Sequence, residues 1–396
     1  MSESIKVLMV GPDRGVHGGI SALVNSYIEA GLSDKVSLKY IGTMKEGGKI
    51  KKLFVAFFAY VDFLLSVGNY DIVHVNFSSD SSFMRKSLFI RAAHRRGRKI
   101  LLHQHGGDFV NYYENEISDK RRRYIRDVLD MGDVMLVLTE SWREFFGRLT
   151  DKRKIRVMPN GIVTKGVMAD KVAVTDKETV AGKESLDVDV NKNLSADKRG
   201  VVGENNMILS AEQNAVSGDM NKILFLGRIC EAKGIRELLK AAGELHAENN
   251  KIHLYIGGIY EDENLRPEIE KCSDFATYIG WVSGKEKDRY LDECGVMAVP
   301  SYFEGFGLTV IEGMLHGCCV VASDVGGIPD IIENEKDGLM VPAKDAAALK
   351  NAIDRVMTDD NLAATLSENG RKKAVEKYSI ERLSEELVGI YKELLS

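Results

Sequence analysis

Short apolar runs rich in β-branched residues alternate with longer helical patterns along most of the chain. Before residue 161 such runs occur at Lys6–Val10, Ile72–Asn76, Ile100–Gln104, Val134–Leu138 and Ile155–Met158. After residue 221 they recur at Ile223–Leu226, His253–Ile256, Thr277–Ile279, Val296–Val299, Cys319–Ala322 and Leu339–Val341. Strands that alternate with helices build βαβ units, in which the strands run parallel. The pattern predicts an α/β chain with two Rossmann-like, doubly wound parallel sheets.

The length of 396 residues suits two domains rather than one hydrophobic core. Residues 162–221 contain no aromatic residue, proline or cysteine, and a segment so poor in large apolar groups can bury little. We therefore expect a first domain at 1–161, an extended or poorly ordered insertion at 162–221, and a second domain at 222–378. A last helical pattern covers 379–396.

Charge is divided unevenly between the two parts of the chain. Residues 1–160 carry 26 Lys and Arg against 18 Asp and Glu, whereas the remainder carries 28 against 41. Much of the positive excess lies at Arg91–Lys99 and Lys120–Arg126. Such clusters attract phosphates of anionic lipid or nucleic acid. We expect peripheral contact with an anionic membrane and no nucleic-acid partner, while solvated helix faces remain the open alternative.

The segment Lys51–Leu65 contains nine consecutive apolar residues before Asp62 interrupts it. It is shorter than the ~18 residues that a membrane crossing needs. We expect a buried helix of the first domain, with an interfacial helix as the alternative because Lys51 and Lys52 flank its start. The chain begins without a secretory pattern, and its five cysteines form no paired framework. These features predict a cytoplasmic protein, with any membrane contact at the inner face.

A loop at Gly227–Gly234, with the sequence GRICEAKG, follows one predicted strand and precedes a helical pattern at Ile235–His246. Free backbone N–H groups and the helix dipole favour an anion at such a junction. Arg228 and Lys233 add two cations that can converge on one diphosphate. A solvated turn with incidental basic residues is the alternative.

A second loop, EGFGLTVIE at Glu304–Glu312, follows the strand that ends at Val299. Its glycines permit close backbone approach, and the N–H groups at the helix start would face a ligand. These are the N–H groups of Phe306, Gly307, Leu308 and Thr309. Glu304 would lie near a reacting sugar, and Glu312 is suited to holding ribose hydroxyls, as acidic residues do in dinucleotide sites. A surface helical glutamate is the alternative for Glu312.

The pair Arg228 and Lys233, followed by Glu304, seven residues and Glu312, resembles the retaining glycosyltransferases of family 4. The resemblance covers nearly the whole chain. It includes four further segments: Gly15–Gly19, His105–Gly106, Pro159–Gly161 and Ser323–Pro329. It implies the GT-B architecture, in which two Rossmann-like domains face each other across a cleft, and a last helix that packs back on the first domain. The insertion after Gly161 departs from the usual pattern of the family.

The resemblance also implies roles for individual residues. Arg228 and Lys233 would bind the donor diphosphate, with the backbone of Phe306–Thr309 contacting phosphate and Glu312 holding the ribose. Glu304 would contact the transferred sugar. Gly18 and Gly19 would approach the phosphates, and His105 would lie beside the sugar, although a histidine satisfied within the core is the alternative.

These features predict a retaining glycosyltransferase that moves a sugar from a nucleotide-sugar donor to a carbohydrate or lipid-linked acceptor, in cell-surface polysaccharide or glycolipid synthesis. No Asp-x-Asp motif stands out at a strand end, so we expect neither an essential metal nor another cofactor. An epimerase or a phosphorylase of the same architecture remains an alternative, as does a nucleotide-sugar-binding subunit without turnover. A dehydrogenase is disfavoured because Gly11–Gly19 does not spell GxGxxG.

Overall fold

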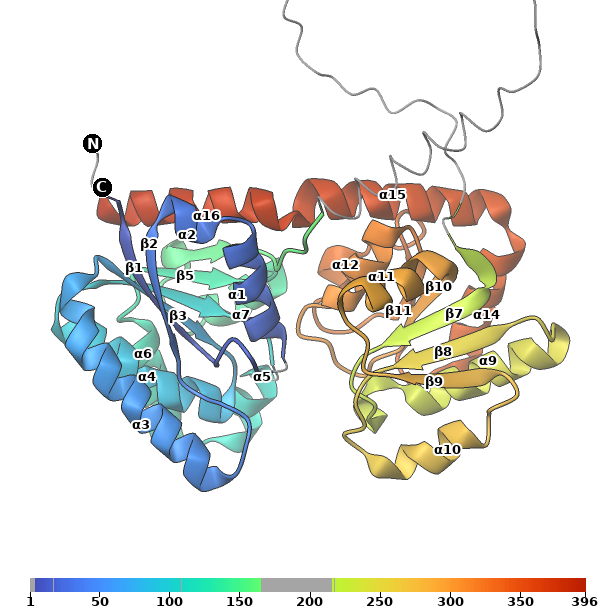
Figure 1. Cartoon of the computed structure of the whole chain (residues 1–396), viewed down its shortest axis with the longest axis horizontal. Helices are drawn as coiled ribbons and strands as arrows, with labels where there is room; N and C mark the ends of the chain where they lie inside the picture. Colours follow the sequence, from blue (N-terminus) through green and yellow to red (C-terminus); the bar gives the residue numbers. More distant parts are fainter. Residues whose placement is uncertain (1–3, 17, 108, 165–215, 217) are drawn as a thin grey trace, which may run out of the picture. The chain divides into compact units, whose positions relative to one another are not determined.

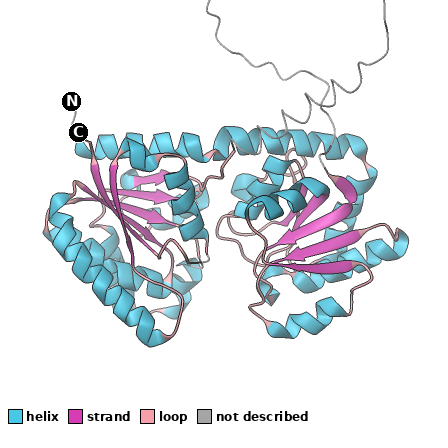
Figure 2. Ribbon diagram, in the orientation of Figure 1, coloured by secondary structure: helices cyan, strands magenta, loops and turns pink. Residues whose placement is uncertain are grey.

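The computed structural model describes residues 4–16, 18–107, 109–164, 216 and 218–396, and these ranges contain two six-stranded sheets (Figures 1 and 2). The first sheet has the order β2-β1-β3-β4-β5-β6 and the second the order β12-β11-β10-β7-β8-β9. Every pairing between neighbouring strands is parallel. The predicted fold class, α/β with two doubly wound sheets, is confirmed.

The strands follow the apolar runs of the sequence. Those of the first sheet are β1 (Lys6–Gly11), β2 (Ser37–Gly42), β3 (Ile72–Phe77), β4 (Lys99–Gln104), β5 (Val134–Val137) and β6 (Ile155–Val157). Those of the second are β7 (Asp219–Leu226), β8 (His253–Gly257), β9 (Ala276–Gly280), β10 (Cys294–Val299), β11 (Cys319–Ser323) and β12 (Leu339–Val341). The sequence analysis missed β2, which is only partly buried and carries alternating polar residues.

Helices cover both faces of each sheet (Figure 1). Those in the first part of the chain are α1 (Gly19–Glu29), α2 (Leu32–Lys35), α3 (Lys49–Ser66), α4 (Asp80–Arg95), α5 (Phe109–Asn111), α6 (Asp119–Leu129) and α7 (Glu140–Gly147). Those in the second are α9 (Ile235–Glu248), α10 (Arg266–Glu270), α11 (Gly284–Glu293), α12 (Leu308–His316), α13 (Ile328–Ile331), α14 (Ala346–Thr358), α15 (Asp360–Tyr378) and α16 (Ile380–Leu395).

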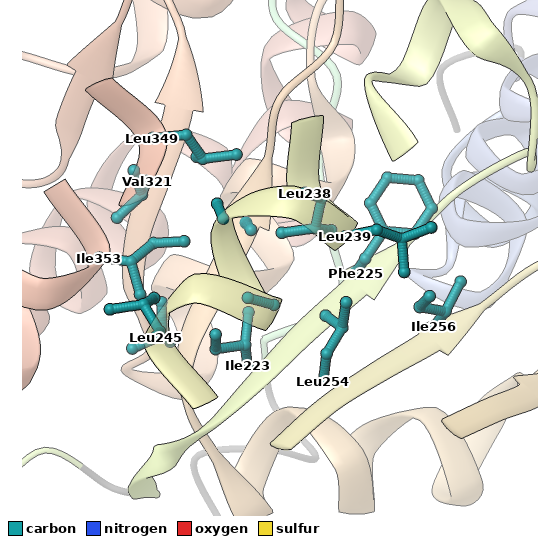
Figure 3. Packing of buried hydrophobic residues seen from close by; sticks show 14 of the residues in the cluster. Ile223, Phe225, Leu238, Leu239, Leu245, Leu254, Ile256, Val321, Leu349 and Ile353 are labelled. Atoms are coloured by element: carbon teal, nitrogen blue, oxygen red, sulfur yellow. The ribbon is translucent and has the colours of Figure 1, made fainter. Parts of the chain in front are cut away.

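Each sheet has its own hydrophobic core. In the second, side chains of β7 and β8 interlock with those of α9 and α14, as Figure 3 shows for Ile223, Leu238, Leu254 and Ile353. Strands buried on both faces need continuous apolar runs, which is why β10 reads CGVMAV and is buried throughout. This packing fixes the carboxyl ends of the strands, where the loops of interest begin.

The last two helices pack against different sheets. α15 contacts α12 and β11 of the second sheet, whereas α16 contributes Leu383, Leu387 and Tyr391 to the core beneath β1 and α1 of the first. The helices meet at Ser379, which forms a bridge with Ile162. α16 is thus an integral part of the first hydrophobic core.

Two expectations about segments change. The expectation that α3 is a buried helix is wrong for one of its faces, which carries exposed phenylalanines. The expected insertion, 162–221, ends too late, because β7 already begins at Asp219. Most of the expected insertion, residues 165–215 and 217, lies outside the described ranges. Within the described part of the chain, no helix is both long enough and apolar enough to cross a membrane.

Candidate functional site

The strand order of the second sheet marks a place where loops diverge. β7 lies between β8, the next strand in the chain, and β10, the third strand after β7. The chain therefore leaves β7 on one side of the sheet and β10 on the other. In doubly wound sheets ligands bind at such a switch point, outside the carboxyl ends of the strands. The loops found there are those after β7 and β10, which contain the predicted site residues.

The loop after β7 ends in a short 3₁₀ turn, Glu231–Lys233, followed by Gly234 with φ +69°. A Cβ atom at Gly234 would collide with the carbonyl oxygen of Pro300, so glycine lets this loop rest directly on the loop after β10. Lys233 Nζ consequently forms an ion pair with Glu304 Oε1, and the two side chains are only 14% and 17% exposed. The structure brings together two residues that are far apart in sequence.

Glu304 is held from its backbone as well. The N–H of Gly327 donates to the Glu304 carbonyl oxygen at 3.0 Å, and a Cβ at Gly326, which has φ +56°, would collide with that oxygen. The Ser301 hydroxyl lies 3.4 Å from Glu304 Oε1. The loop after β11, part of the predicted segment Ser323–Pro329, therefore holds the backbone from which the Glu304 carboxylate extends.

Arg228 occupies the same loop as Lys233 but has a different partner. Its guanidinium pairs with Glu261 at 2.7 Å, and its side chain is 63% exposed. In this structure the two cations do not converge on one point. An exposed arginine can exchange a carboxylate for a phosphate at little cost, because both are bidentate acceptors.

The helix α12 begins directly after this loop. Gly307 adopts φ +105° and caps α12 without a side-chain hydrogen bond. The Phe306 side chain is buried against Tyr378, with ring centroids 6.1 Å apart. The first N–H groups of the helix, those of Leu308 and Thr309, are therefore not capped by a side chain, which is the arrangement that favours an anion.

Glu312 lies on α12 and is held by a residue that the sequence analysis did not single out. Lys287 of α11 donates to Glu312 Oε1 at 2.8 Å, and the side chains are 29% and 22% exposed. Glu312 is thus neither a free surface glutamate nor fully buried. One oxygen is occupied by the lysine, and the carboxylate is fixed in orientation.

The first sheet carries three neighbouring imidazole rings that we call the histidine cluster: His74 and His103, which are buried, and His105, which is partly buried. His74 Nδ1 is hydrogen-bonded to the hydroxyl group of Tyr391 in α16 at 2.6 Å, and His74 Nε2 to His103 Nδ1 at 3.2 Å. The His103 and His105 rings lie 4.0 Å apart. Asn76 donates to Val10, so its oxygen accepts from His105 Nε2 at 2.7 Å.

Burial keeps the histidine cluster uncharged. It lowers the pKa of His74 to about 3, with the charge of His105 adding to the effect. It likewise lowers the pKa of His105 to about 3, although the nearby Asn160 side chain opposes the shift. His105 is therefore neutral at pH 7. Its predicted place after β4 is as expected, but it belongs to a packed cluster, and its proposed role beside a sugar stays a prediction.

Gly18 and Gly19 lie at the start of α1, as expected. Both are exposed, and a Cβ at either position would meet no atom within 4 Å. The chain itself therefore does not require glycine for packing here. Close approach of a ligand to the backbone remains a prediction for these two residues.

Comparisons with known proteins identify the family of the chain. Residues 208–373 match the family described as Glycosyl transferases group 1, and residues 42–165 match Glycosyltransferase Family 4. An uncharacterized glycosyltransferase of Methanocaldococcus jannaschii is 31% identical over 43% of this chain and 44% of its own length. The capsular polysaccharide biosynthesis glycosyltransferase CapM of Staphylococcus aureus is 28% identical over 43% of this chain and 46% of its own length.

The matches to these curated relatives thus span less than half of their length. A solved structure, that of Anabaena HepE in complex with UDP and glucose, is similar with a TM-score of 0.67 and 14% identity, over 98% of this chain and 99% of that one. This likeness shows the fold. Together the two family matches cover β3, β4, β5 and β6 of the first sheet, the whole second sheet and both loops of the site. The chain therefore belongs to the group 1 and family 4 glycosyltransferases.

Proposed function

We propose that the chain transfers a sugar from a nucleotide-sugar donor to a carbohydrate or lipid-linked acceptor, with retention of anomeric configuration. The observation that carries the proposal is the Lys233–Glu304 ion pair at the switch point of the second sheet. The helix α12, which follows Glu304 in the chain, provides uncapped N–H groups at its start and the Glu312 carboxylate, which is paired with Lys287. UDP and glucose in the HepE structure support a nucleotide-sugar donor, and the CapM relative supports cell-surface polysaccharide synthesis.

Lys233 would bind the donor diphosphate, whose negative charge grows as the bond to the sugar breaks. Once Lys233 contacts the bound diphosphate, it would stabilise this growing charge without further reorganisation during the transfer. When the diphosphate enters, Lys233 would turn from Glu304 to phosphate, with the α12 N–H groups as further donors. The Glu304 carboxylate, released from Lys233 on a backbone that the loop after β11 holds, would then face the transferred sugar as its anomeric carbon gains positive charge.

Glu312 would hold the ribose. Because Lys287 occupies Oε1, the remaining oxygen is oriented to accept from ribose hydroxyls. Arg228 would leave Glu261 to contact the outer phosphate oxygens. The leaving phosphate itself would take the proton from the attacking hydroxyl, so His105 would contribute a neutral hydrogen-bonding ring rather than a charge.

We also propose a cytoplasmic location. Each of the five cysteines lies in the described part of the chain, and none forms a disulfide there. This usage fits a reducing compartment.

The test is a panel of nucleotide sugars, scored first by thermal shift and then by release of free nucleotide. The proposal expects one donor to stabilise the protein and to release its nucleotide when an acceptor is present. NMR of the product should show the anomeric configuration of the donor. An inverted product contradicts the retaining mechanism, binding without turnover favours the non-catalytic subunit, and an isomerised nucleotide sugar favours an epimerase. Release of a sugar 1-phosphate from an oligosaccharide, when inorganic phosphate is supplied, indicates a phosphorylase.

A further inference from the structure

The helix α3 exposes an unusually apolar face. Its exposed large hydrophobic residues are Ile50 (74%), Leu53 (72%), Phe54 (60%), Phe57 (60%), Phe58 (64%), Val61 (37%) and Leu65 (78%). Most recur at intervals of three or four residues, which places them on one side of the helix. Single exposed apolar residues are ordinary, but a continuous row of this length marks a surface that contacts something.

The opposite side of α3 packs within the protein. Ala59, Phe63 and the following Val67 are buried, and the Phe63 ring packs edge-on against Phe89 of α4 at 5.0 Å. α3 and α4 lie side by side over the sheet (Figure 1). The sheet therefore accounts for one face of α3, and the exposed row needs a separate explanation.

Cations lie near both ends of the exposed row. Lys51 and Lys52 are exposed in its first turns, and the Arg96 guanidinium donates to the Leu64 carbonyl at its far end. The acid within the helix, Asp62, is neutralised by Lys39 at 2.6 Å. An apolar stripe with cations at both ends has the composition of a helix that lies in a membrane interface.

Two arginines of the second basic cluster, Lys120–Arg126, serve the fold instead. On α6, Arg122 donates to the carbonyl oxygen of Tyr113 and pairs with Asp119, and Arg126 donates to the Tyr113 hydroxyl. These guanidinium groups hold the segment before α6 in place. The cations that border the exposed row of α3 are therefore the better candidates for a contact with another surface.

We propose that α3 docks on an anionic lipid bilayer, with its phenylalanines at the acyl boundary and Lys51, Lys52 and Arg96 among the headgroups. The charges indicate that an anionic bilayer, and not a second copy of the chain, covers the exposed face of α3. A second copy of the chain on the same face would bring cations against cations, because a parallel pairing opposes Lys51 to Lys51 and an antiparallel one opposes it to Arg96. Anionic headgroups neutralise all three, each basic residue near such a surface strengthening binding by about fivefold.

This inference concerns binding alone and does not rest on the proposed reaction. At about 1.5 Å per residue, the 18 residues of α3 extend for roughly 27 Å. That length lets the helix lie along the surface, where binding grows with the apolar area that is buried. Docking through α3 would hold the protein at the membrane plane.

The experiment is sedimentation of the full chain with vesicles of phosphatidylcholine alone and with added phosphatidylglycerol. The wild type should sediment with the anionic vesicles and much less with the neutral ones. The triple variant Phe54→Ser/Phe57→Ser/Phe58→Ser should weaken this binding by about tenfold or more, since each ring no longer gains from leaving water. Lys51→Gln/Lys52→Gln should weaken it by up to about thirtyfold, and added salt should mimic that change.

Trp281→Ser is the matched control, because this large ring is 53% exposed on the second part of the chain. It should bind vesicles as the wild type does. The α3 variants should keep the wild-type thermal transition, which separates lost docking from lost folding. Failure of the wild type to sediment with anionic vesicles would overturn the proposal, as would undiminished binding by the triple variant. A dimer that the triple variant abolishes, seen by light scattering, would assign the face to a second copy.

Discussion

Glu312→Gln distinguishes a ribose clamp from a glutamate that only anchors a neighbouring helix. The substitution keeps the shape of the side chain and removes the charge that ribose hydroxyls and Lys287 both use. A hydrogen bond to a charged group contributes about 1.5 to 3 kcal/mol. At about 1.4 kcal/mol per factor of ten, its loss should raise the donor Kd and KM by about ten- to a hundredfold.

Because ribose contacts are the same in the ground and transition states, kcat should change little. The effect on folding should be small. Glu312 and Lys287 are 22% and 29% exposed, so water screens the pair and its loss should cost less than about 1 kcal/mol of the free energy of unfolding.

Lys287→Met is the matched control for this experiment. It breaks the same ion pair but leaves the Glu312 carboxylate charged and able to accept from ribose. Titration calorimetry with the donor nucleotide should show a much smaller loss of affinity for Lys287→Met than for Glu312→Gln. Equal losses in the two variants would refute the clamp, because they would trace the effect to the ion pair between α11 and α12.

Further predictions concern the other proposed residues and the fold. Glu304→Gln should lower kcat by about ten- to a hundredfold with a smaller change in KM, since its contact strengthens in the transition state, as steady-state kinetics can show. Arg228→Ala and Lys233→Ala should each lower kcat and raise KM. In the same assay the effect should be smaller for Arg228, whose side chain is 63% exposed, than for Lys233, whose side chain is 14% exposed. Burial lowers the folded-state pKa values of the histidine cluster, and that of His74 falls from 6.5 to about 3. The unfolded chain therefore takes up protons first, and the free energy of unfolding should decrease as pH falls from about 6.5 toward 3. The loss, measured by urea unfolding, should be roughly 1 kcal/mol per pH unit for each of these histidines. Replacing residues 169–214 by a short Gly/Ser linker should leave nucleotide affinity nearly unchanged by calorimetry, because their composition cannot form a core.

The sequence was most informative where apolar periodicity determines structure. Central strands such as β3 and β10 appear as expected because each is a continuous apolar run buried on both faces. Ser37–Gly42 was missed because an edge strand with one partner can alternate Ser and Lys with apolar residues. The face of α3 was misjudged because hydrophobicity alone does not distinguish a side chain against a sheet from one against a membrane.

The candidate site was accessible from sequence only in part. Loop residues such as Lys233 and Glu304 could be found because glycines and strand ends mark them. Their pairing depends on the parallel order that places β7 next to β10. Lys287 had no signal, since nothing in an exposed helix indicates that it reaches Glu312 on the next helix. Tyr391 was likewise hidden, because its contact with His74 spans 317 positions.

The central claim, that a donor diphosphate binds at the carboxyl edge of the second sheet, is tested most directly by calorimetric titration with UDP, GDP and ADP. The account predicts that at least one of them binds the wild type with one-to-one stoichiometry. Lys233→Met should weaken that binding by about tenfold or more, because the lost group is a charged hydrogen-bond donor. Absence of binding by all three nucleotides, or equal affinity in the wild type and Lys233→Met, would contradict it.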